Sequence, residues 1–292
     1  ELYYNVGLSF VKWLEEKSSK TPSDIWITVT RDARLHSPSL AQALERGLTD
    51  AGVNVVDLGL APTPIGYYSE AAGLPENVTK GNNVTAAMII TASHNPSEYN
   101  GLKMTFERQT LNEKQIREVR DITFANWTEA PSNYSAVVIN YDIIPDYQAD
   151  MLERFAGIGK GIKVVVDSAN ATGGVVAPEL YKKLGCEVVE LFSEPDGRFP
   201  NHHPNPSDEK TLDAIKKSVI ENKADLGIAF DGDSDRIGVI DSLGHSMTGD
   251  KLLLIYALDL IDTCKKSGDK LPTVVSEVKC SQVLYDTINS TG

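Results

Sequence analysis

The stretch Ala86-Ala-Met-Ile-Ile-Thr-Ala-Ser-His-Asn-Pro96 indicates the fold. Its first five residues form a short apolar run of the kind that a buried strand needs. The run stops at Thr91, and Pro96 prevents the strand from continuing. Ser93, His94 and Asn95 therefore follow the carboxyl end of a buried strand, where open α/β sheets place their ligand sites. Taken alone, the stretch is also compatible with a polar turn that caps a strand.

The second half of the chain repeats the pattern of the first. We expect strands at 25–29, 53–56 and 86–90 in the first half and at 162–166, 187–192 and 226–230 in the second. Helices at 37–52 and 178–184 each end at a glycine, and a further helix is expected at 212–220. Asp32 and Ser93 are 61 residues apart, and Asp167 and Asp231 are 64 apart. The sequence therefore predicts an α/β fold of repeated three-layer units with mixed sheets, each carrying functional residues after its third strand.

A third copy of the unit is expected to begin near the end of the sequence. A strand is predicted at 273–278 and a helix at 281–288. Alternating glycines at 157–161 favour a boundary between the first two units. We therefore expect domains at 1–157, 158–250 and 251–292. The third functional loop would fall beyond the last residue, so we expect part of a longer protein or a shortened relative of one.

Charge and hydropathy argue against two classes of partner, nucleic acid and membranes. The 292 residues carry a net charge of −13, which disfavours nucleic acid. No apolar run approaches the roughly 20 residues of a membrane span, so no membrane partner is expected. The three cysteines lie far apart in sequence, which is typical of a reducing compartment and predicts a cytoplasmic location. The oligomeric state stays open.

The segment Asp231-Gly-Asp-Ser-Asp-Arg236 places three carboxylates at alternate positions after a predicted strand. Such carboxylates repel one another and can converge on one hard cation. An EF-hand would need glycine and glutamate where Arg236 and Ser242 stand, and a haloacid-dehalogenase-type phosphatase would need threonine or valine in place of Asp235. A solvated acidic turn is a further alternative. We favour a Mg²⁺ site for phosphoryl transfer.

Two other polar segments have plainer interpretations. His202 and His203 are adjacent, so their side chains are expected to diverge in a proline-rich surface loop rather than bind a metal. The segment Asn170-Ala-Thr-Gly-Gly174 is expected to turn a strand into the next helix, although it could also bind phosphate.

The segment Thr91-Ala-Ser-His-Asn-Pro-Ser-Glu-Tyr-Asn-Gly-Leu-Lys103, together with the aspartate segment, resembles the α-D-phosphohexomutase family, and more narrowly its phosphomannomutase/phosphoglucomutase branch. The segments 199–204 and 276–280 are similar to that branch too. The resemblance implies domains 1 and 2 of that family plus the start of domain 3. It also implies an isomerase that transfers a phosphoryl group reversibly between the 1- and 6-positions of mannose or glucose phosphate. A phosphoserine at Ser93 would carry the group through a hexose 1,6-bisphosphate.

The resemblance also implies roles for individual residues. One Mg²⁺ per chain would be held by the three aspartates and by the phosphate on Ser93, and glucose 1,6-bisphosphate would act as activator and intermediate. Lys103 would be a general acid/base, and we expect its pKa to be lowered toward neutrality. Arg236 and Lys279 would bind substrate, and His94 would orient the serine loop. Arg31, Asp32 and Asn95 would support the site.

The sequence departs from the family pattern in three places. A strand with glycine and arginine ahead of Glu1 is absent, as are the sugar-recognition loop Gly-Glu-x-Ser-Gly-His and the final phosphate-binding domain. Those parts choose the sugar, so the preferred hexose phosphate stays open. The alternatives are a phosphoglucosamine mutase and a shortened, non-catalytic relative that binds a metal. We expect this chain alone to be poorly active.

Overall fold

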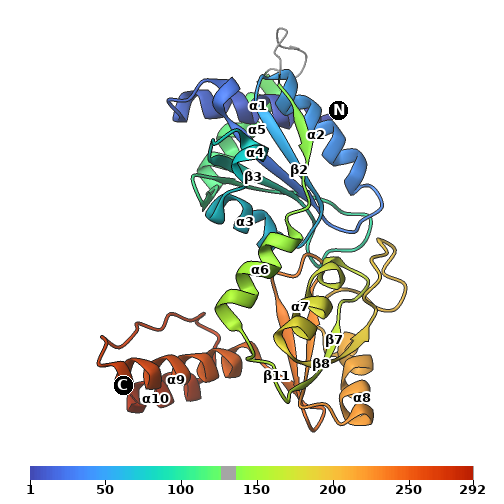
Figure 1. Cartoon of the computed structure of the whole chain (residues 1–292), viewed down its shortest axis with the longest axis vertical. Coiled ribbons are helices and arrows are strands. Elements are labelled where there is room, and N and C mark those ends of the chain that lie inside the picture. Colours follow the sequence, from blue (N-terminus) through green and yellow to red (C-terminus); the bar gives the residue numbers. More distant parts are fainter. Residues whose placement is uncertain (126–135, 292) are drawn as a thin grey trace.

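Two α/β units and a helical arm make up the chain. The computed structural model describes residues 1–125 and 136–291 (Figure 1). The first unit lies above the second in this view, and helix α6 (Ile144–Phe155) runs between them. The arm of α9 (Gly249–Ser267) and α10 (Gln282–Thr291) projects from the second unit.

The sheet of the first unit is mixed and has the order β5-β4-β3-β1-β2-β6. Strands β3, β1, β2 and β6 are parallel, and β4 and β5 extend the β3 edge in antiparallel fashion. Every residue of β3 is buried, as the apolar run predicted. The strands are β1 (Trp26–Arg31), β2 (Asn54–Leu60), β3 (Val84–Ile90), β4 (Leu102–Phe106), β5 (Gln109–Thr110) and β6 (Val138–Asn140).

The second sheet repeats this arrangement in the order β11-β10-β9-β7-β8. Strands β9, β7 and β8 are parallel and β10 is antiparallel to β9, just as β4 is antiparallel to β3. The predicted repeat of α/β units with mixed sheets is therefore confirmed. The strands are β7 (Lys163–Asp167), β8 (Glu187–Leu191), β9 (Leu226–Phe230), β10 (Ile237–Asp241) and β11 (Ser246–Met247).

Helices cover the sheets, and those predicted at 37–52, 178–184 and 212–220 begin and end within two residues of the observed helices. Gly52 and Gly185, the expected helix ends, both have positive φ, which suits the turn that follows a helix. The remaining α-helices are α1 (Leu2–Lys17), α2 (Ser37–Asp50), α3 (Thr63–Ala72), α4 (Glu76–Thr79), α5 (Glu113–Ala125), α7 (Ala177–Leu184) and α8 (Asp213–Asn222). Single 3₁₀ turns lie at Pro22–Asp24, Thr172–Val175 and Glu209–Leu212.

One hydrophobic cluster belongs to both units. It joins Trp26 and Val56 of the first sheet to Leu180 and Leu184 of α7, and apolar side chains of α6 pack against it. Burying apolar surface between the units is favourable by about 25 cal/mol per Å². This shared core joins the two units.

The strand predicted at 273–278 is wrong. This segment pairs with no strand among the described residues, and Val275 and Val278 are 82% and 87% exposed. A strand without a partner leaves its backbone groups unpaired, so a β-favouring sequence is not enough to form one. The helix predicted at 281–288 is confirmed as α10.

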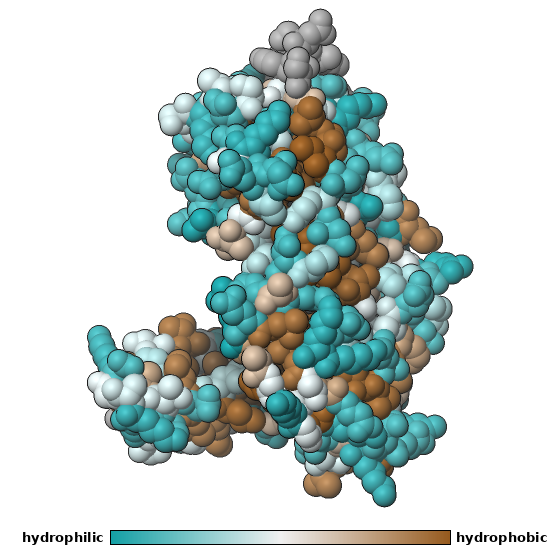
Figure 2. Space-filling view, in the orientation of Figure 1, coloured by the Kyte–Doolittle hydropathy of each residue, from teal (hydrophilic) through white to brown (hydrophobic). Residues whose placement is uncertain are grey.

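The helical arm exposes apolar side chains. Figure 2 shows apolar surface along it, and Ile255, Leu260 and Val283 are about half exposed or more. In the described part of the chain, no helix is both long and apolar enough to cross a bilayer.

Gly47 lets α1 and α2 pack closely, and its replacement should destabilise the first unit. A Cβ atom at Gly47 would lie 2.1 Å from the carbonyl oxygen of Tyr4. We expect Gly47→Ala to lower the free energy of unfolding by about 1–3 kcal/mol, because overpacking forces the helices apart. Urea unfolding measures this. Gly249→Ala, which meets open space at the start of α9, is the control and should unfold like the parent.

Candidate active site

The loop after β3 holds Ser93 in an unusual backbone conformation. Ser93 has φ +52°, in the left-handed region that non-glycine residues seldom adopt. Its N–H donates to the Thr91 hydroxyl at 2.8 Å, and the N–H of Asn95 donates to the Ala92 carbonyl at 2.9 Å. Asn95 also donates from its side chain to the Ala92 carbonyl. These bonds form a tight turn that presents the serine hydroxyl beyond the carboxyl end of β3.

The aspartate loop after β9 approaches Ser93 from the second unit. A Cβ atom at Gly232 would lie 2.3 Å from the Ser93 carbonyl oxygen, so only glycine fits there. The Ser93 hydroxyl donates to Asp231 Oδ2 at 2.7 Å. The shared apolar core thus brings together two loops that lie 138 residues apart in sequence.

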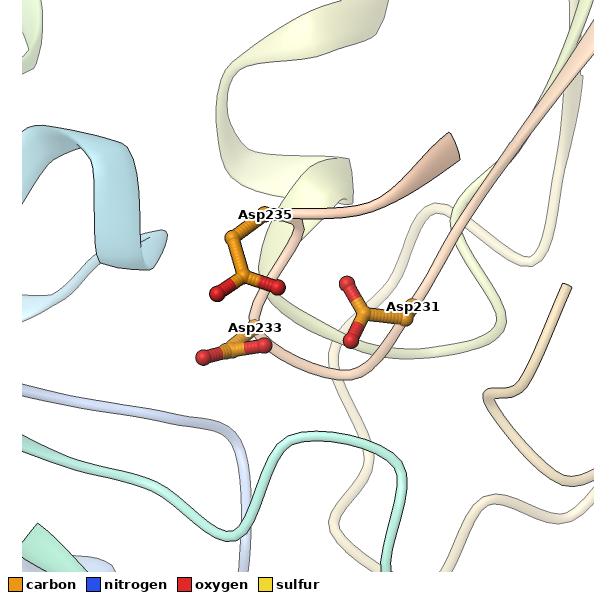
Figure 3. Close-up of side chains that lie close together, drawn as sticks. All are labelled: Asp231, Asp233 and Asp235. Atoms are coloured by element: carbon orange, nitrogen blue, oxygen red, sulfur yellow. The ribbon is translucent and has the colours of Figure 1, made fainter. Parts of the chain in front are cut away.

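Three carboxylates converge in this loop. Asp231, Asp233 and Asp235 each offer an oxygen, and these atoms lie within 4.8 Å of one another (Figure 3). Asp231 and Asp233 are buried, and Asp235 is exposed. Oδ1 of Asp233 is buried and has no hydrogen-bond partner among the described residues. A buried carboxylate oxygen is costly to leave unpaired, so the cluster fits a hard divalent cation that oxygen ligands prefer.

Burial and neighbouring groups together shift the pKa values of the two buried aspartates in opposite directions. Burial, followed by repulsion from Asp233, raises the pKa of Asp231 to about 6, although Ser93 and Arg236 act in the opposite direction. Burial would also raise the pKa of Asp233, but hydrogen bonds from Lys103 and Thr63 outweigh it, so that pKa is lowered. Of these two aspartates, Asp233 is therefore held more firmly in its charged form.

Lys103 lies among the carboxylates. Its ammonium group donates to Asp233 Oδ2 and to Asp235 Oδ2, each at 2.6 Å. The expected lowering of the Lys103 pKa is wrong for this arrangement. Burial lowers it, but the hydrogen bonds and charges of Asp233 and Asp235 outweigh burial, and the pKa is raised.

Arg236 joins the two loops. It donates to Asp231 Oδ2 at 2.7 Å and also contacts Ser93 Oγ and His94 Nδ1. Burial, and then the charge of Arg236, lowers the pKa of His94. A neutral imidazole accepts through Nδ1, so His94 can hold the guanidinium beside the serine.

Three further residues are predicted for the site: Arg31, Asp32 and Lys279. Arg31 pairs with Asp57 at 3.1 Å, and Asp32 is buried below the serine loop. Lys279 is 87% exposed and lies 3.7 Å from Glu277; no contact in the described ranges joins it to Ser93 or to the aspartates. Its role in substrate binding stays a prediction.

Sequence reasoning missed two residues of this site. Thr63 is fully buried, and its hydroxyl donates to Asp233 Oδ2 at 2.6 Å while its N–H donates to the Asp233 carbonyl. Arg34 contacts the serine loop from the loop after β1. Both follow strands whose carboxyl ends lie at the site edge, and that position was the available signal.

The prediction of a surface position is wrong for His202, whereas His203 is exposed. The His202 side chain is 15% exposed, and its Nε2 lies 3.1 Å from Oδ2 of the buried Asp167. Burial lowers the pKa of His202, but the hydrogen bond and charge of Asp167 outweigh it, so the pKa is raised.

Two family models and several relatives that match this chain carry phosphoglucomutase or phosphomannomutase names. The phosphoglucomutase/phosphomannomutase alpha/beta/alpha domain I matches residues 1–130, and domain II matches residues 145–244. A phosphomannomutase/phosphoglucomutase of Pseudomonas aeruginosa is 39% identical over 267 residues, which cover 91% of this chain and 54% of that protein. A phosphoglucomutase of Neisseria gonorrhoeae is 36% identical over the same shares.

Among solved structures, a phosphoglucomutase/phosphomannomutase family protein of Burkholderia thailandensis superposes with a TM-score of 0.86 at 32% identity. The match covers 99% of this chain and 60% of that one. The chain thus spans about half the length of the curated relatives that it matches.

We predict that the His202–Asp167 pair stabilises the fold more at low pH than at high pH. Because the folded-state pKa of His202 is raised, its stabilisation is complete below the unfolded value of about 6.5 and is lost as the pH rises through the folded value. Replacing His202 by Gln should cost about 1.5–3 kcal/mol at pH 6 and clearly less at pH 9. Unfolding by urea at both pH values measures the difference. His245→Gln, whose pair with Asp241 is exposed, should show little effect at either pH, and a pH-independent loss for His202→Gln would contradict the assignment.

We predict that Mg²⁺ stabilises the chain through the aspartate loop. A ligand that binds only the folded state adds about 2.7 kcal/mol at 100 times its dissociation constant, so Mg²⁺ should raise the melting temperature. Asp233→Asn should abolish most of that gain. Thr63→Val should weaken Mg²⁺ binding about 10- to 100-fold, because it removes the hydroxyl that orients Asp233.

Titration of Mg²⁺ followed by thermal unfolding separates these variants. Asp121→Asn, on the exposed face of α5, is the matched control and should respond like the parent. If Asp233→Asn also responds like the parent, the aspartate loop is not the site.

Proposed function

This chain belongs to the phosphoglucomutase/phosphomannomutase family, and on that basis we propose that it transfers a phosphoryl group between the 1- and 6-positions of a hexose phosphate. Ser93 is the carrier, and a hexose 1,6-bisphosphate is the intermediate. The relatives compared above carry mannose and glucose mutase names, which favours those sugars over glucosamine. Glucose 1,6-bisphosphate serves as activator.

The observation that carries this proposal is the contact of the Ser93 hydroxyl with the carboxylate cluster. Ser93 Oγ lies 2.7 Å from Asp231 Oδ2 and also contacts Arg236. A phosphoryl group on this oxygen would stand between a guanidinium and a cation site, and both stabilise negative charge.

The residues present fit one Mg²⁺. Asp231, Asp233 and Asp235 would hold it, together with an oxygen of a phosphate on Ser93, and the unpaired Oδ1 of Asp233 supports this. When bound, Mg²⁺ would neutralise charge on the transferring phosphoryl group.

Lys103 is the proposed group that exchanges a proton with the sugar hydroxyl. At present its ammonium is bound by Asp233 and Asp235. A cation on the same carboxylates would compete with Lys103 for them and remove the partners that raise its pKa. Burial would then lower that pKa, as a general acid/base near neutral pH requires.

The remaining assignments are proposals of the same kind. Arg236 binds a phosphate, His94 and Asn95 order the serine loop, and Lys279 contacts substrate. The net charge of −13 argues against a nucleic-acid partner. The free cysteines Cys186, Cys264 and Cys280 support a cytoplasmic location.

The test is phosphoryl transfer to Ser93. Incubation with Mg²⁺ and glucose 1,6-bisphosphate should add the mass of one phosphoryl group to the chain, because the serine is presented to the cation site. Intact-mass spectrometry with peptide mapping measures the product and its position. Ser93→Ala is the control and should gain nothing. A chain that is stabilised by Mg²⁺ yet never labelled would contradict the mutase and favour the non-catalytic metal-binding relative.

A further inference from the structure

Arg34 is a buried arginine that binds the backbone of the serine loop. It is 1% exposed. Its Nη2 donates to the carbonyl oxygens of Ser93 at 3.0 Å and Asn95 at 2.7 Å, and its Nη1 donates to the carbonyl of Pro96. One side chain thus binds three of the four carbonyls between positions 93 and 96.

Asp32 fixes the position of Arg34. Asp32 Oδ2 accepts from Arg34 Nε at 2.9 Å, and Oδ1 accepts from the Arg34 N–H at 3.1 Å and from the Ser37 hydroxyl at 2.6 Å. Asp32 Oδ2 also lies 3.4 Å from the N–H of Ala92. A buried charge needs a paired and hydrogen-bonded partner, and here that partner is itself tied to the serine loop.

The serine loop needs such a support because its backbone is strained. A non-glycine residue in the left-handed region persists only where its surroundings over-determine it. Ser93, at φ +52°, is such a residue, and three carbonyls bound to Arg34 supply the constraint. The carbonyl dipoles also face a cation, so they are not available to repel an incoming phosphoryl group.

The second unit covers Arg34 from the other side. The Phe199 ring lies 5.5 Å from the Arg34 guanidinium carbon. A Cβ atom at Gly197 would lie 2.4 Å from the Ala33 carbonyl oxygen and 2.8 Å from the Arg34 Cα. Arg34 therefore sits where the serine loop meets the unit that carries the aspartate loop, and it can fix one against the other.

We propose that Arg34 is a positioning residue for phosphoryl transfer. Its guanidinium holds the 93–96 loop in the conformation that directs Ser93 Oγ at Asp231 and Arg236. Lysine cannot replace it, because a single ammonium nitrogen cannot reproduce a planar fork that reaches three carbonyls and Asp32 together. The catalytic part of this inference rests on the proposed function, whereas the positioning part does not.

The first measurement begins with the parent chain. Amide hydrogen exchange of peptides covering 91–97 should be slow in the parent chain, although Asn95 and Ser97 are exposed, because the loop is held from behind. Arg34→Lys should speed exchange in these peptides at least tenfold, with the strands β7–β9 unchanged. Rapid exchange of the loop in the parent would overturn the proposal.

The second measurement is the rate of Ser93 labelling by glucose 1,6-bisphosphate. Arg34→Lys should slow labelling about 100-fold at saturating donor, the scale of a misplacement of about 1 Å, with little change in the half-saturating concentration of the donor. The Mg²⁺-induced rise in melting temperature should persist, because the aspartate loop is untouched.

Two controls separate positioning from loss of stability. Gly47→Ala destabilises the first unit away from the serine loop, so it should label at the parental rate. Arg154→Lys, whose pair with Asp150 is on the surface of α6, should also behave like the parent. Arg34→Lys that labels within twofold of the parent and leaves exchange unchanged overturns the proposal. A parent that exchanges slowly but is never labelled refutes the mutase and leaves Arg34 as a support of the loop.

Discussion

Repulsion among three carboxylates is the constraint on which the rest of this structure depends. Asp231, Asp233 and Asp235 lie within 4.8 Å of one another, and two of them are buried. Such a cluster is stable only if positive charge and hydrogen-bond donors surround it. The chain supplies these from separate elements: Lys103 from β4, Arg236 from the loop before β10, and Thr63 from the start of α3. The need to neutralise the cluster therefore determines which parts of the fold must meet.

The shared apolar core makes that meeting possible. The cluster that joins Trp26 and Val56 to Leu180 and Leu184 buries apolar surface between the first unit and the second. Hydrophobic burial is non-directional, so it brings the units together without specifying the polar geometry. The directional bonds of Thr63 and Arg236 across the junction then select one arrangement.

Residues behind the serine loop stabilise its strained backbone at the junction of the two units. Ser93 stays in the left-handed region and Gly232 permits its carbonyl to come close, so the serine hydroxyl reaches the carboxylates. The buried Asp32–Arg34 pair lies behind the serine loop, and the guanidinium donates hydrogen bonds to the carbonyls of that loop. Functional sites commonly store such strain where the surrounding structure over-determines it. The surrounding structure thus holds the serine hydroxyl beside the carboxylates.

Local patterns determined much of this protein. The apolar run of β3, the alternation of Asp231, Asp233 and Asp235 and the repeated order of strands predicted the fold and the two central loops, because each depends on neighbours in sequence. Tertiary structure alone decided what depends on distant partners. The 273–278 segment has a β-favouring sequence but no strand to pair with, and Lys103 keeps its charge because two aspartates 130 and 132 residues away bind it. Apart from their place after the carboxyl ends of β1 and β2, Arg34 and Thr63 carry no local signature of a site. Their roles arise from which carbonyls and carboxylates the folded chain brings within hydrogen-bond distance, and a bond between residues so far apart in sequence exists only after the chain has closed around it.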